Sequence, residues 1–137
     1  MWIVFALLSA FFAALTSILA KIGIQNVNSN LATAIRTIVV LIMSWGIVFV
    51  TGKHNEILSI GHRNIVFLTL SGIATGLSWL CYFRALQIGE ASKVIPIDKF
   101  SLAIGMVMAF AILKETITVK TIIGGILITI GTFVLIF

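Results

Sequence analysis

Five long apolar segments, separated by short polar connections, restrict this chain to one class of structure. A helix of about 20 residues, rising about 1.5 Å per residue, crosses the roughly 30 Å hydrocarbon core of a bilayer. Short connections place successive helices antiparallel. We therefore predict an all-α integral membrane protein, a single domain over residues 1–137 that forms a bundle of five transmembrane helices. The expected helices cover residues 1–20, 31–50, 65–88, 91–113 and 121–137.

The composition agrees with a chain that lies in lipid. Hydrophobic residues make up 61% of it, charged residues make up 9%, and its mean hydropathy is +1.24. A water-soluble domain of this size could not cover so much apolar surface with polar side chains. We therefore expect membrane lipid as a partner and a bacterial or archaeal plasma membrane as the location.

The net charge of +5 comes from basic residues that lie mostly near the ends of the apolar runs. This pattern indicates membrane topology rather than nucleic-acid binding. His54 and His62 lie in a connection without a cysteine partner, and Cys81 is the one cysteine of the chain. The sequence shows no paired nucleophile and base, no metal-ligand spacing and no phosphate loop. We therefore expect no enzymatic activity, no cofactor and no metal site.

The predicted helices define two sides of the membrane, which we name face A and face B. Face A carries the N-terminus and the connections at residues 51–64 and 114–120. Face B carries the connections at residues 22–30 and 89–90. We expect no soluble domain on either face within these 137 residues.

Four ionisable residues inside the apolar segments share one depth, roughly 6–12 Å from face B. They are Arg36, Arg84, Asp98 and Lys99. Such a cluster is what a polar cavity open toward face B needs. The alternative for Arg36, Arg84 and Lys99 is that their long side chains extend to the membrane surface at face B.

Asp98 cannot use that alternative, because its carboxylate stands on a single methylene. A charged residue deep in hydrocarbon costs about 2.5–3.5 kcal/mol on insertion scales, so it usually faces a cavity or a partner charge. The candidate partners are Arg84, Arg36 and Lys99, although adjacent residues on a helix point in different directions and pair poorly. We expect Asp98 to lie in a cavity or a charge pair.

Pro96 lies just before this aspartate. Proline has no N–H to donate, so it frees the carbonyl of Ser92 and favours a kink. Freed carbonyls near membrane charges are typical of substrate or ion sites in transporters with broken helices. Prolines also kink membrane helices without any role in transport.

The third segment carries a line of polar side chains at helical spacing: Ser71, Thr75, Ser78 and Tyr82. This line, with Trp79, could border a polar pathway. Each hydroxyl could instead bond to its own helix backbone. In the fourth segment Ser101, Gly105 and Ala109 recur at four-residue spacing, which is typical of helix packing in membranes. Ser101 is also counted among the candidate pathway residues.

Three stretches together resemble the EamA-type family of the drug/metabolite transporter superfamily. They are YFRALQIGEASKVIPIDK from Tyr82 to Lys99, LKETIT from Leu113 to Thr118, and GGILITIGTFVLI near the end of the chain. The resemblance implies a multi-pass carrier of small metabolites, with Asp98 and Lys99 in the helix that lines the central pathway and Glu115 as a loop anchor. Most members carry two such repeats in inverted orientation. This chain has one repeat, so the second would come from another subunit.

Three functions follow as hypotheses. The first is a transporter of a small metabolite, anionic or zwitterionic, that works by alternating access as an antiparallel homodimer or, alternatively, a heteromer. In that case Asp98, Lys99, Arg84 and Arg36 line the pathway. The second is a subunit of a flippase for a lipid-linked sugar, and the third is an accessory membrane protein that transports nothing.

Overall fold

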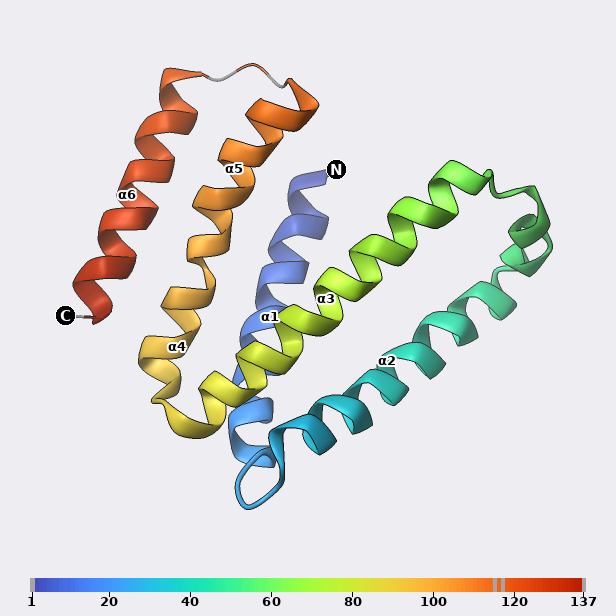
Figure 1. Cartoon of the computed structure of the whole chain (residues 1–137), viewed down its shortest axis with the longest axis horizontal. Coiled ribbons are helices and arrows are strands. Elements are labelled where there is room, and N and C mark those ends of the chain that lie inside the picture. Colours follow the sequence, from blue (N-terminus) through green and yellow to red (C-terminus); the bar gives the residue numbers. More distant parts are fainter. Residues whose placement is uncertain (1, 115, 117, 137) are drawn as a thin grey trace. The chain divides into compact units, whose positions relative to one another are not determined.

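A computed structural model describes residues 2–114, 116 and 118–136. Over these residues the chain is built of helices and short connections (Figure 1). The helices are α1 (Trp2–Gly23), α2 (Ser29–Val50), the 3₁₀ helix η1 (Lys53–Ser59), α3 (His62–Ile88), α4 (Ala91–Asp98), α5 (Phe100–Leu113) and α6 (Val119–Ile136).

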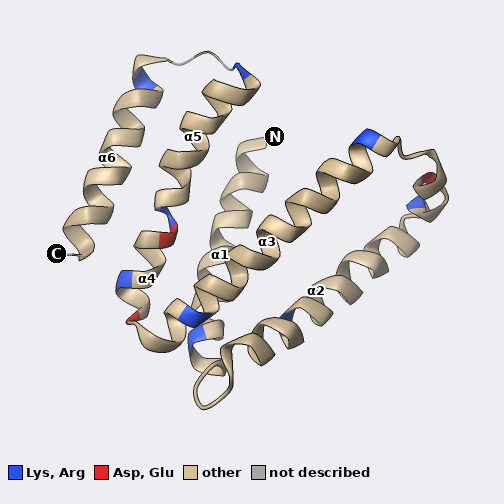
Figure 2. Ribbon diagram, in the orientation of Figure 1, with Lys and Arg blue, Asp and Glu red and all other residues tan. Residues whose placement is uncertain are grey.

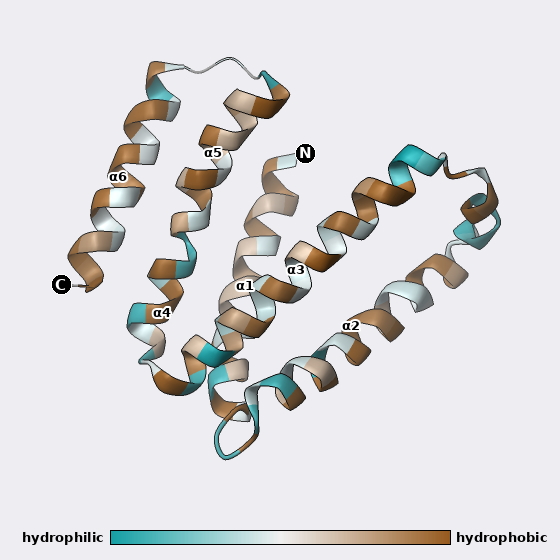
Figure 3. Ribbon diagram, viewed as in Figure 1, coloured by the Kyte–Doolittle hydropathy of each residue, from teal (hydrophilic) through white to brown (hydrophobic). Residues whose placement is uncertain are grey.

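The predicted membrane spans are confirmed within a few residues. Five stretches of the described chain are long and apolar enough to cross a bilayer: α1, α2, α3, the pair α4 and α5 taken together, and α6. Figure 3 shows hydrophobic residues along these helices and more hydrophilic ones toward the connections. Residues 1 and 137, which the expected spans included, lie outside the described residues. The protein is therefore an all-α membrane protein.

A side-chain cap extends α2 beyond its predicted start. The Asn28 side-chain oxygen accepts hydrogen bonds from the backbone N–H of Asn30 at 2.9 Å and of Leu31 at 3.4 Å. These bonds satisfy donors that the first turn of a helix leaves without partners. The helix consequently begins at Ser29, inside the polar connection on face B.

The fourth span divides into α4 and α5 one turn after Pro96. The N–H of Lys99 is shared between the carbonyls of Ile95 at 3.3 Å and Pro96 at 3.1 Å. Because Pro96 cannot donate, the carbonyl of Ser92 has lost its ordinary helical partner. The helix geometry is therefore interrupted at Lys99, beside the charged pair of this span.

The chain packs as two compact units. The first unit consists of residues 1–18 and 88–137, and the second consists of residues 19–87. The single domain expected over residues 1–137 stays a prediction.

The core of the second unit lies where α3 ends. Ile24, Phe83 and Leu86 are buried, with 2%, 3% and 0% of their surfaces exposed, and they are joined by the buried Ser29 and Thr33. These residues come from the turn just after α1, the start of α2 and the end of α3. Their burial joins the three helices at face B.

Two hydrogen bonds between distant parts of the chain reinforce this core. Lys21 Nζ donates to the carbonyl of Leu86 at 2.5 Å, and the Gln87 side-chain amide donates to the carbonyl of Val27 at 2.7 Å. The Leu86 carbonyl lies in the last turn of α3, where it has no partner within the helix, and the Val27 carbonyl lies in the connection between α1 and α2. The face B end of the second unit is therefore held by packing and by polar contacts together.

In the first unit α5 and α6 lie side by side (Figure 1). The rings of Phe100 and Phe133 meet edge to face with their centroids 6.2 Å apart. A Cβ at Gly125 would come within 2.8 Å of the terminal methyl of Met106. The end of the Met106 side chain therefore lies over Gly125 and occupies the space that a side chain there would take.

Candidate functional site

A groove of about 920 Å³ runs between α2 and α3 and is bordered at one end by η1, all within the second unit. Its volume is in the range of sites that bind small molecules. The residues that line it, and that define the α2–α3 groove, are Thr37, Val40, Leu41, Ser44, Trp45, Val48, Lys53, Glu56, Ile57, Ser59, Ile60, Asn64, Leu68, Ser71, Gly72, Thr75, Gly76 and Trp79.

The middle of this groove offers hydroxyl groups for binding. Ser44 on α2 and Ser71 on α3 have hydroxyls that make no hydrogen bond with any residue in the described part of the chain. Thr37 and Thr75 donate to the carbonyls one turn earlier in their own helices, at 2.8 and 2.9 Å, and each retains lone pairs as acceptors. The groove can therefore both donate to a ligand and accept from it.

Aromatic and small residues shape the walls. Trp45 comes from α2 and Trp79 from α3, so each helix supplies one large ring. Gly72 and Gly76 lie in α3, and a Cβ built at either glycine meets no atom within 4 Å. The groove is therefore open beside the glycines and flanked by aromatic surface, a combination that suits an organic ligand.

Arg36 lies beside the Trp79 end of the groove. Its guanidinium carbon is 4.2 Å from the centroid of the Trp79 ring and 5.4 Å from that of Phe83. A desolvated cation over an aromatic face gains about 2 kcal/mol. Over residues 2–114, 116 and 118–136, the guanidinium makes no hydrogen bond and no ion pair.

The contacts of this side chain bear on the two interpretations of Arg36 that the sequence leaves open. Phe83 lies nearer the end of α3 at face B, and Trp79 lies about one turn deeper. The guanidinium is closer to the deeper ring. Arg36 therefore points toward the interior of the span, whereas a side chain extending to face B would point the opposite way.

Arg84 behaves differently, since it donates to the side-chain oxygen of Gln87 at 2.8 Å, toward the end of α3. This contact agrees with an arginine that extends to face B. Arg63 lies over Phe67 at 5.9 Å, and Lys53 forms an ion pair with Glu56 across exposed positions of η1. Figure 2 shows that charged residues gather toward the helix ends and connections of this unit.

In the first unit, Asp98 and Lys99 form an ion pair with Nζ and Oδ2 3.6 Å apart. Their side chains are 37% and 48% exposed. We expected adjacent residues to pair poorly, and this pair is indeed long, although the interruption at Lys99 and the flexible lysine stem permit it. The other two expected partners, Arg36 and Arg84, belong to the second unit. A half-exposed pair at this distance leaves the Asp98 carboxylate open to a further ligand.

Comparison with known proteins identifies the family. A sequence model of the EamA-like transporter family matches residues 1–137. The chain belongs to this family. It is 43% identical over 134 residues to the uncharacterized transporter in the cobO 3′ region of Sinorhizobium sp, covering 98% of this chain and 95% of that protein.

A second relative of this EamA-like protein is an uncharacterized protein of Methanocaldococcus jannaschii. It is 30% identical over 83 residues, which cover 61% of each of the two chains. No solved structure matches the chain significantly. The resemblance found in the sequence is thereby confirmed, and the protein is a multi-pass membrane protein of a transporter family.

Only some of the polar residues that the sequence predicted along one face of α3 line the groove of this EamA-like protein. Ser71, Thr75 and Trp79 line it, but Ser78 and Tyr82 are not among its lining residues. The part of α3 that faces α2 is centred on Gly72, Thr75 and Trp79, which places Ser78 at its edge, and Tyr82 lies beyond the groove's end. The Tyr82 ring instead lies beside that of Phe83, with centroids 6.4 Å apart.

Sequence reasoning missed the contribution of α2 to this groove. Thr37, Ser44 and Trp45 were not singled out, and Gly72 and Gly76 were interpreted only as a packing motif. A signal was present, since Thr37, Ser44 and Trp45 recur at seven- and eight-residue spacing on one helix face. That periodicity alone could not show which neighbouring helix the face would meet.

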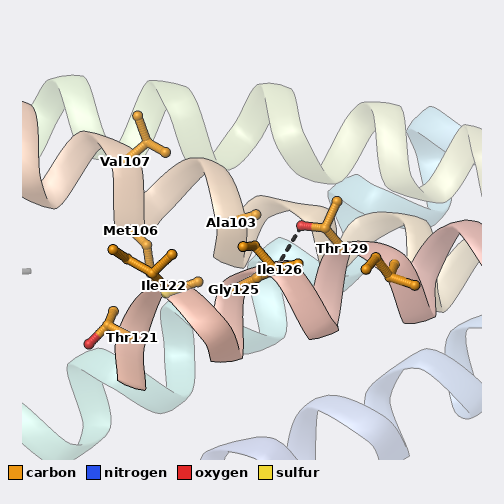
Figure 4. Close-up of a pocket in the computed structure, with 9 residues that line it drawn as sticks. Ala103, Met106, Val107, Thr121, Ile122, Gly125, Ile126 and Thr129 are labelled. Carbon is orange, nitrogen blue, oxygen red and sulfur yellow. Dashed lines mark hydrogen bonds between the residues drawn. The ribbon is translucent and has the colours of Figure 1, made fainter. Parts of the chain in front are cut away.

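The first unit also has a pocket, which differs in chemistry from the α2–α3 groove. It has a volume of about 350 Å³, and its lining from α5 and α6 is almost wholly apolar (Figure 4). The hydroxyl of Thr129 donates to the carbonyl of Gly125, and that of Thr121 is bonded to Thr118. The few hydroxyls of this pocket are therefore already engaged in hydrogen bonds within or beside α6. Ser101 is exposed in the first turn of α5 and does not line it, and Glu115 lies outside the described residues.

We expect Pro96→Ala to leave the protein folded but to slow transport by about threefold or more, as changes at hinge positions often do. The alanine restores an N–H that can bond to the carbonyl of Ser92 and so stiffens the junction of α4 and α5. Uptake into proteoliposomes would be compared with that of Ile97→Ala, which alters the same helix without adding a donor. Equal uptake by Pro96→Ala and wild-type protein would show that the kink is only structural.

Proposed function

We propose that this protein carries a small metabolite across the cell membrane through the α2–α3 groove. The observation that carries the proposal is the pair of unused hydroxyls, Ser44 and Ser71, inside helices long and apolar enough to cross a bilayer. Lipid offers no partner to such groups, so polar surface at this depth is expected to face water, protein or a ligand. A polar solute that bonds to both helices satisfies this requirement.

Transport by alternating access is supported by the interruption between α4 and α5. The half-exposed carboxylate of Asp98 and the ammonium of Lys99 lie where the helix geometry breaks, as coupling-ion and substrate groups do in many carriers. We propose that these two residues contribute to transport by this protein. Two copies of the chain, inverted relative to each other, would supply the two-fold symmetry that a single repeat lacks.

A ligand screen with a matched pair of variants tests the role of the groove. Ligands that bind the native state raise the midpoint of thermal unfolding, so purified protein would be screened against metabolites and lipid-linked sugars. Gly76→Leu places a side chain inside the groove, where a Cβ meets no protein atom. Gly46→Leu is the control, because Gly46 also has open space but does not line the groove.

We expect at least one metabolite to stabilise wild-type protein and Gly46→Leu but not Gly76→Leu, and to be taken up by proteoliposomes. A stabilising metabolite that is insensitive to Gly76→Leu would place its site elsewhere. Stabilisation by lipid-linked sugars alone would favour the flippase, and no stabilisation by any class would favour an accessory protein.

A further inference from the structure

We infer that the guanidinium of Arg36 binds an oxyanion group, a carboxylate or a phosphate, of a small organic molecule at the Trp79 end of the α2–α3 groove. The inference rests on the proposed function for the identity of this molecule as a transported substrate. The binding itself needs only the geometry of the second unit.

The hydrogen-bond donors of the Arg36 side chain are available to a ligand. A guanidinium presents five N–H groups in a planar fork that matches the two oxygens of a carboxylate or phosphate. Trp79 and Phe83 attract its charge, but within the part of the chain that the structure describes these donors form no hydrogen bond. Since the rings already hold the side chain in place, little conformational freedom is left to lose when an oxyanion binds.

The carboxylates of the described residues form ion pairs with lysines and not with Arg36. Each acidic side chain in the described ranges is paired with a lysine close to it in the sequence: Glu56 with Lys53, Glu90 with Lys93, and Asp98 with Lys99. Glu56 is also the one acidic residue of the sequence from residue 19 to residue 87. The second unit therefore holds a cation inside a membrane span without a carboxylate of its own to neutralise it.

The direction of the Arg36 side chain favours a soluble oxyanion over a phospholipid headgroup. Headgroup phosphates lie at the membrane surface, whereas the Arg36 guanidinium is nearer to Trp79 than to Phe83 and so points away from face B. Arg84, whose contact with Gln87 points toward face B, has the direction expected of a residue that meets headgroups. The position of Arg36 beside the groove favours a solute that enters through it.

Calorimetric titration of the purified protein in a phosphate-free nonionic detergent tests the inference with three related probes. Benzoate and phenyl phosphate carry an oxyanion on the same ring, and benzamide is a neutral molecule close in shape to benzoate. We expect wild-type protein to bind at least one of the two anions about tenfold or more tightly than benzamide, since two charge-assisted hydrogen bonds are made only with the anion. This comparison uses the unaltered protein and does not depend on the folding of a variant.

Two variants of Arg36 and one matched control locate the site. Arg36→Gln is expected to reduce the preference for the anion over benzamide to within about threefold, because it removes the charge. Arg36→Lys is expected to give an intermediate preference, because it keeps the charge but loses the fork. Arg63→Gln removes an arginine from the same unit that does not line the groove, and it is expected to leave the preference unchanged.

Equal binding of the anions and benzamide by wild-type protein, or an unchanged preference in Arg36→Gln, would overturn the inference. Displacement of the bound anion by phosphatidylglycerol but not by phosphatidylcholine would also overturn it, because the site would then belong to an anionic lipid. Transport is measured separately, by uptake into proteoliposomes. A lack of uptake would not change the calorimetric evidence for anion binding. The inferred site and the proposed function can therefore fail independently.

Discussion

Uptake by proteoliposomes containing Asp98→Asn is expected to fall by about tenfold or more, as the loss of an intramembrane charge in a pathway should cause. The asparagine has nearly the same shape, so the fold should survive, but it carries no charge and cannot exchange a proton. The Asp98 carboxylate lies in a span of 23 residues and forms a long ion pair with Lys99, with Oδ2 and Nζ 3.6 Å apart. We propose that a role in carrying the substrate or an ion accounts for a carboxylate at this depth.

The measurement is uptake of the ligand found by the thermal screen, with and without a pH gradient across the vesicle membrane. Asp98→Glu is the matched control, because it keeps a carboxylate at the same position and should retain a substantial part of the activity. Thermal unfolding and monodisperse elution would establish that each variant is folded. Wild-type uptake by Asp98→Asn under a pH gradient would remove Asp98 from the mechanism.

About half of the protein molecules in a cell are expected to expose face A to the outside, because the charges that orient the chain are nearly balanced. A five-helix repeat begins and ends on opposite sides of the membrane, so two fused repeats become inverted automatically. A single repeat achieves the same inversion only if its copies insert in both orientations. The working unit proposed above therefore requires dual insertion.

The charge balance follows from the basic residues on each face. Face A has four in its connections: Lys53, Arg63, Lys114 and Lys120. Face B has Lys21 and Lys93 in the helix turns beside its connections and gains Arg84, whose side chain is directed toward that face. The remaining bias is about one charge, too small to impose one orientation, and any residual preference would place face A in the cytoplasm.

Thiol labelling measures the orientation in intact cells. Asn55→Cys, in a Cys81→Ser background, places a thiol on exposed η1 at face A. Gln25→Cys in the same background places one in the exposed connection at face B. With a membrane-impermeant reagent we expect each site to be labelled about halfway in intact cells and fully after lysis.

A single orientation would give a different result, because one of the two sites would be labelled almost completely and the other hardly at all. That outcome would contradict the antiparallel homodimer and favour a heteromer or a parallel assembly. The two sites serve as controls for each other, since a thiol that is merely unreactive stays unlabelled after lysis as well.

The spans themselves were determined by the sequence alone. Runs of about 20 apolar residues must form helices in lipid, because every backbone N–H and C=O needs a partner within its own segment. The same logic predicted an interruption near Pro96, where a donor is missing, and the depth of Arg36 and Asp98 from the residue count along each helix. The structure shortened or extended the predicted helices mainly where a local contact, such as the Asn28 cap, could not be inferred from hydropathy.

What only the tertiary structure decided is which side chains of different helices meet. The sequence left two directions open for Arg36, and the structure places its guanidinium over the Trp79 ring of α3. In the same way, Gly72, Thr75 and Trp79 of α3 line the groove. Ser78 and Tyr82, which the sequence predicted as pathway residues, do not line it. Helical periodicity groups the residues of one face, but the rotation of that face toward a neighbour depends on close packing between segments distant in the sequence.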